Sequence, residues 1–118
     1  MQELTFLQDN DIDTDTAIEL LGDVDMYNDT LADFLTESET RMPNIEKYKN
    51  QGDLENYAIL VHALKSDSKY LGFTHLAELA YNHQIESQNH NQEYINTHYE
   101  DLVAETNRII KVVKEYLG

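Results

Sequence analysis

Apolar residues recur at steps of three and four along most of the chain, a spacing that gathers them on one face of a helix. In the second half of the chain, one such stripe consists of Ile95, Tyr99, Leu102, Thr106, Ile109, Val113 and Tyr116. A comparable stripe in the first half consists of Tyr27, Leu31, Phe34, Ser38, Met42, Ile45 and Tyr48. Each stripe predicts a long amphipathic helix.

Two further stripes lie between these helices. A helix over residues 54 to 71 would carry on one face Tyr57, Leu60, Val61, Leu64, Ser68 and Leu71. The next segment carries on one side Leu76, Leu79, Ala80 and His83. Ahead of all four stripes, residues 14 to 21 predict a short helix, and the first ten residues predict a short turn that covers one end of the others.

Helix boundaries are marked by glycines and by side chains that can cap a helix. Three of the four glycines stand at the predicted joints, at positions 22, 52 and 72. The residues that can accept the free amides of the following helix are Asp23, Asp53 and Thr74. Pro43 lies inside a predicted helix, where it removes a backbone hydrogen bond, so we expect a kink or a break near Met42.

The predicted fold is all-α. No Asn-Gly or Asp-Gly hairpin dipeptide occurs, and short joints favour antiparallel neighbouring helices. We expect one domain of 118 residues, long enough to bury its own core. Residues 23–116 would form an antiparallel four-helix bundle, and residues 1–22 would form one or two short helices that cover one end.

Composition and charge narrow the possible functions. The formal net charge is −15, and residues 1–40 contain twelve Asp or Glu and no Lys or Arg, so we expect no binding to nucleic acid. No apolar run approaches a membrane span, no basic segment precedes an apolar one, and cysteine is absent. We therefore expect a cytoplasmic monomer without membrane association or disulfides.

Motifs for metal and nucleotide chemistry are also missing. The five histidines include no pair three or four residues apart, so we expect no metal site and no cofactor. No Gly-rich phosphate loop precedes a Lys and a Ser or Thr, so the chain should neither bind ATP nor act as a kinase.

His62 is the candidate reactive residue. On a helix, its side chain would point away from the apolar stripe, in a row with Ala58 and Lys69 and beside Lys65 and Ser66. An exposed imidazole beside two ammonium groups suits a nucleophile that accepts an anionic group. From position alone, however, a surface histidine without a special role is the commoner case.

Residues 62 to 72 resemble the signature of histidine phosphotransfer (HPt) domains of multistep phosphorelays. The positions that match are His62, Leu64, Lys65, Ser68, Leu71 and Gly72. Ser66 stands where the family usually has glycine. The segment that leads into this helix is also similar to that of the family, at residues 11–13, at residues 20–23, and at Tyr27, Leu31 and Phe34. Downstream, Leu76, Leu79 and Ala80 fit the family's next helix. In that helix, His83 and Gln84 replace the common Leu and Glu.

The resemblance implies a phosphocarrier. His62 would accept a phosphoryl group on Nε2 from the phosphoaspartate of a receiver domain and pass it to another receiver; one of these can belong to a hybrid sensor histidine kinase. Lys65 would balance the phosphoryl charge, and Gly72 would end the helix as a structural residue. Mg²⁺ would be supplied by the receiver.

Partner contacts are expected around the histidine, at Ala58, Ile59, Ser66 and Lys69. Small and apolar side chains at positions 58 and 59 would let a receiver approach closely. The Ser66 hydroxyl either forms a hydrogen bond with the imidazole or the phosphate, or takes up space where the receiver would bind. Because of Ser66, an alternative stays open: a degenerate bundle that docks a receiver or another protein without carrying phosphate.

Overall fold

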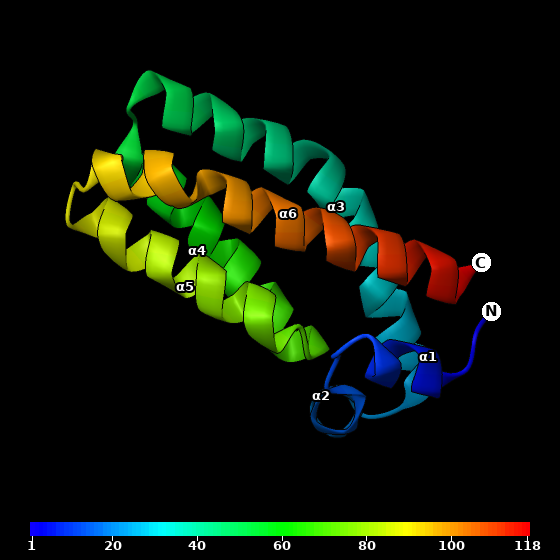
Figure 1. Cartoon of the computed structure of the whole chain (residues 1–118). Helices are drawn as coiled ribbons and strands as arrows, with labels where there is room; N and C mark the ends of the chain where they lie inside the picture. The colour runs from blue at the N-terminus through cyan, green and yellow to red at the C-terminus, as the bar shows by residue number, and fades with distance from the viewer.

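The computed structural model describes all 118 residues, and it contains six helices and no strand. The helices are α1 (Leu4–Asp9), α2 (Thr14–Leu21), α3 (Val24–Gln51), α4 (Leu54–Leu71), α5 (Thr74–Gln88) and α6 (Gln92–Leu117). Figure 1 shows α3 to α6 packed along one another, with α1 and α2 grouped at one end of the bundle. The predicted all-α bundle with short N-terminal helices is therefore confirmed. No helix combines the length and apolar character that a membrane span requires.

The core is made by the stripes that the sequence predicts. The residues of α4 that are buried are Leu54, Tyr57, Val61, Leu64, Ser68 and Leu71. The stripe of α6 is buried at every predicted position except Tyr99, which is half-buried. Because one face of each long helix is occupied in this way, the opposite face of α4 is free to carry polar residues into solvent.

Two predicted helix details can be compared with the structure. Of the kink or break expected near Met42, the break is absent, because α3 continues through Pro43. Pro43 is exposed, so water can bond the carbonyl group that its missing N–H leaves unpaired. The predicted cap at Thr74 is wrong, since α5 starts after Phe73 and has no side-chain cap. The buried ring of Phe73 lies edge-on to Phe34, with the centroids 5.1 Å apart, so core packing fixes this helix start.

Hydrogen bonds tie the C-terminal end of α4 to the N-terminal segment and to α3. The backbone N–H of Asp13 donates to the carbonyl oxygen of Gly72 over 2.9 Å, and the buried hydroxyl of Tyr27 donates to the carbonyl of Leu71 over 2.8 Å. Gly72 has a φ of 84°, and a Cβ atom there would collide with the Asp13 carbonyl oxygen. Glycine is therefore required both by the left-handed conformation and by the close approach of the N-terminal segment.

Candidate functional site

His62 lies in the middle of α4, on the exposed face opposite the core. Its Nδ1 donates a hydrogen bond of 3.1 Å to the side-chain oxygen of Gln84 on α5. An amide oxygen can only accept, so Nδ1 carries the ring hydrogen of the neutral imidazole. Nε2 then keeps its lone pair, which makes it the nucleophilic atom of the ring.

The register between α4 and α5 follows from the short joint that connects them. The two helices pack closely and antiparallel on either side of Gly72 and Phe73. His62 and Gln84 each lie eleven residues from Phe73 in the sequence. On the solvent side of the α4–α5 contact, side chains that are equally far from Phe73 therefore lie opposite each other.

Lys65 and Tyr81 are a second pair of residues that are equally far from Phe73. Lys65 lies eight residues before Phe73, and Tyr81 lies eight residues after it. The ammonium nitrogen of Lys65 is 5.5 Å from the centroid of the Tyr81 ring. Lys69 is exposed, one turn further along α4. The basic side chains flank the histidine on the solvent side of the helix.

A shallow hollow beside the imidazole is lined by Ala58, Ile59, His62, Gln84 and Gln88. The structure thus brings two of the predicted partner residues, Ala58 and Ile59, together with the histidine. Ile59 is 61% exposed, so it leaves apolar surface beside the histidine. Ser66 is half-buried outside this hollow, and the imidazole bonds Gln84 instead of the Ser66 hydroxyl.

Behind Gln84, a buried polar chain connects three helices. The hydroxyl of Tyr57 on α4 donates to Nδ1 of His83 over 2.8 Å, and Nε2 of His83 donates to the backbone carbonyl of His98 on α6 over 3.1 Å. Burial lowers the pKa of His83 and raises that of Tyr57, so both side chains stay uncharged at neutral pH. His83 is thus a fully bonded core histidine and is not available as a ligand.

The side of α4 that faces α3 holds an interhelical ion pair. Arg41 on α3 has a nearly buried side chain and donates to Asp67 over 2.7 Å and to Glu37 over 2.9 Å. The Asp67 carboxylate therefore holds α3 against α4.

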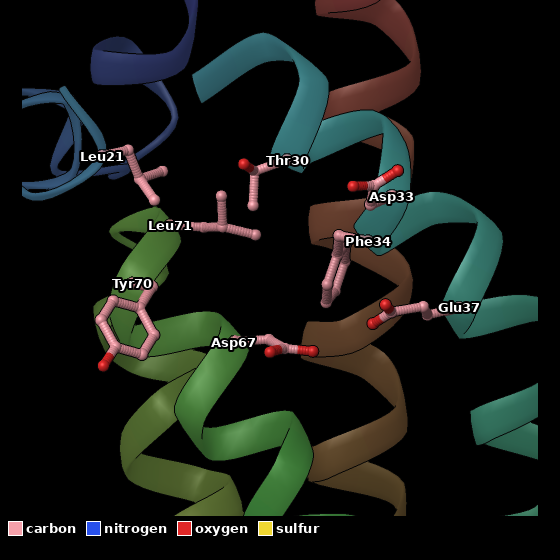
Figure 2. A pocket seen from close by; sticks show the side chains of 8 residues that line it. All are labelled: Leu21, Thr30, Asp33, Phe34, Glu37, Asp67, Tyr70 and Leu71. Atoms are coloured by element: carbon pink, nitrogen blue, oxygen red, sulfur yellow. The ribbon is translucent and has the colours of Figure 1, made fainter. Parts of the chain in front are cut away.

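Close to this ion pair is a cavity of about 270 Å³. Figure 2 shows Asp67 and Leu71 of α4 directed toward α3 side chains across it, with Leu21 at one end and the Tyr70 ring on the side away from α3. Its lining combines apolar groups from Leu21, Phe34 and Leu71 with the carboxylates of Asp33, Glu37 and Asp67.

The site consists of one exposed imidazole with two lysines on the same helix beside it. No group of three or more His, Asp or Glu side chains is arranged to hold a metal ion.

Sequence reasoning missed Gln84 and Tyr81 as contacts of the candidate residues His62 and Lys65. A usable signal was present, because counting outward from the tight joint after Gly72 pairs both of them with α4.

Comparison with known proteins identifies the family. The family model for the Hpt domain matches residues 29–111, which is 83 of the 118 residues. Neither the curated proteins nor the solved structures provided a match. Hpt domains are helical bundles that act as phosphocarriers in phosphorelays and interact with receiver domains. The chain belongs to the Hpt domain family.

Proposed function

We propose that this chain accepts a phosphoryl group on Nε2 of His62 from the phosphoaspartate of one receiver domain and passes it to a second receiver. The observation that carries the proposal is the hydrogen bond from Nδ1 of His62 to Gln84. This bond favours the tautomer in which Nε2 has the free lone pair, on an exposed helix face that a partner can reach.

The transfer step is a displacement at phosphorus. The Nε2 lone pair forms the new P–N bond while the bond between phosphorus and the aspartyl oxygen breaks, and the aspartate leaves as a carboxylate. Because Nδ1 keeps its hydrogen, the phosphorylated imidazole gains a positive charge. The Gln84 oxygen, which already accepts from Nδ1, stabilises that charge. The reverse displacement on a second receiver returns the ring to its neutral form.

The negative charge on the oxygens of the transferring phosphoryl group is stabilised by cations from this chain and from the receiver. On this chain, Lys65 lies one turn from His62 and would approach those oxygens from the α5 side. A divalent cation bound in the acidic pocket of the receiver would balance the other side. The chain itself then contributes a positioned nucleophile and one ammonium group, which suits a reaction governed by positioning and electrostatics.

The receiver would dock around the histidine. Ile59 and Tyr70 on α4 are 61% and 55% exposed, and on a helix both lie to the same side of the His62 row. These side chains would provide apolar contact area next to Ala58, while Lys69 would meet acidic groups of the receiver. Ser66 lies between the histidine and Tyr70 along the helix, so its hydroxyl would face the docked partner.

The test is transfer from a receiver domain that has been phosphorylated with labelled phosphate. Three chains are compared: the parent, His62→Gln, and the matched control His75→Gln, which removes an exposed histidine on α5. We expect acid-labile, base-stable label on the parent and the control, and none on His62→Gln.

Label that survives in His62→Gln would contradict the proposal. Receiver binding without any label on the parent would instead identify the chain as a docking module. Repeating the assay with receivers from hybrid sensor histidine kinases and from response regulators would show which partners donate and which accept.

A further inference from the structure

We infer that Tyr81 is a positioning residue for Lys65, holding its ammonium group beside the phosphoryl site without neutralising it. This inference rests on the proposed phosphotransfer function. Its basis is the 5.5 Å separation between the Lys65 nitrogen and the Tyr81 ring centroid, which is within the range of a cation–π interaction. Both residues lie one helical turn from the pair formed by His62 and Gln84.

Lys65 contacts the Tyr81 ring and has no carboxylate partner. Asp and Glu outnumber Lys and Arg by 23 to 8 in this chain, yet no ion pair includes Lys65. A carboxylate would cancel the lysine charge and would have to be displaced before the ammonium group could meet a phosphoryl oxygen. An aromatic face attracts the cation but accepts no strong hydrogen bond, so the N–H groups of Lys65 stay free for the phosphate.

The arrangement also explains how α5 serves the site. In successive turns, α5 presents an amide oxygen to His62 and an aromatic face to Lys65. Lys69 forms no such contact with a ring and is exposed. Of the two lysines beside the histidine, only Lys65 is therefore oriented before the receiver arrives, and less side-chain freedom is lost when it meets the phosphoryl group.

The experiment is a double-mutant cycle on the rate of phosphoryl transfer from a phosphorylated receiver, measured by rapid quench. Its members are the parent, Tyr81→Leu, Lys65→Gln and the double variant. We expect Tyr81→Leu to slow transfer about twofold to fivefold in the parent and to have no further effect when Lys65 is already Gln. Tyr81→Phe, which keeps a ring, should slow transfer less than Tyr81→Leu.

Two kinetic results would overturn the inference. An unchanged rate in Tyr81→Leu would show that the ring does not assist Lys65. Equal slowing with and without Lys65 would show that Tyr81 contacts the receiver directly. A parent chain that accepts no label would contradict the proposed function itself.

An NMR spectrum of the unphosphorylated chain, without a receiver, tests the contact separately. The side-chain methylene signals of Lys65 should be shifted upfield by the Tyr81 ring and should lose this shift in Tyr81→Leu. Methylene signals that do not change would contradict the contact even if phosphoryl transfer is observed.

Discussion

Gln84 accepts a hydrogen bond from Nδ1 of His62 over 3.1 Å, and the two residues are equally far along the chain from Phe73. The joint between α4 and α5 therefore decides which α5 side chain meets the histidine. This gives a physical role to the ten-residue spacing between His62 and Gly72 in this chain. A change in that length would rotate the histidine relative to α5 by about 100° per residue, so Gln84 would no longer face it.

Removing the Gln84 acceptor should slow phosphoryl transfer. Gln84→Leu leaves Nδ1 without its partner, so the favoured tautomer and the charge on the phosphorylated ring both lose support. We expect a rate roughly 3-fold to 10-fold lower, measured by rapid quench. The matched control is Asn82→Leu, an exposed residue on the opposite side of α5. Equal rates for Gln84→Leu and the control would contradict the role given to Gln84.

Gly72→Ala should destabilise the protein more than Gly52→Ala does. Both glycines follow a helix in the left-handed conformation, with φ of 84° and 67°, and that conformation costs an alanine about 1–2 kcal/mol. At Gly52 the new methyl group would meet only Gln92, at 3.7 Å, whereas at Gly72 it would collide with the Asp13 backbone. We expect roughly 2 kcal/mol of additional loss for Gly72→Ala in urea unfolding. Similar losses for both variants would show that the N-terminal segment is not held against Gly72.

The two carboxylates that bind Arg41 should contribute unequally to stability. Asp67 joins α4 to α3, and an amide in its place leaves the nearly buried guanidinium group without its charged interhelical partner. We expect Asp67→Asn to lower the free energy of unfolding by about 1–3 kcal/mol. Glu37 lies on the same helix as Arg41 and is 54% exposed, so Glu37→Gln should cost less than about 0.5 kcal/mol. Equal effects in urea unfolding would contradict this assignment.

The stability of the protein should fall on acidification, in part through His83. Burial lowers the pKa of His83 below its ordinary 6.5. Below about pH 6.5, the ordinary pKa of histidine, His83 takes up a proton in the unfolded chain but not in the folded chain. The free energy of unfolding therefore falls as the pH drops. His83→Leu removes this contribution, and the variant should lose less stability than the parent between about pH 7 and about pH 5.5, by up to about 1 kcal/mol. Parallel losses in the two proteins would show that His83 does not titrate in this way.

Most of the fold could be predicted because the core stripes are visible in the sequence. The helix spacing places Tyr57, Val61 and Leu64 on one face of α4 and His62 on the other, and the structure has this arrangement. The caps at Asp23 and Asp53 were also predictable and are confirmed. These features depend on local spacing and on backbone groups at helix ends, which a single segment of sequence specifies.

What could not be predicted depends on contacts between helices. Thr74 has a good capping side chain, but the burial of Phe73 against Phe34 determines where α5 begins. Gln84 and Tyr81 gain their roles only from the register of α5 against α4. A pattern on one helix shows which face is exposed, but not which side chain of a neighbouring helix meets it.

The most direct test of the central claim is an NMR measurement on the chain after transfer from a phosphorylated receiver domain. With nitrogen-labelled histidine, the coupling between phosphorus and nitrogen identifies the atom that carries the phosphoryl group. The proposed mechanism predicts one phosphohistidine, at His62, with phosphorus on Nε2 and a hydrogen retained on Nδ1. Phosphorus on Nδ1, or on any other histidine, would contradict it.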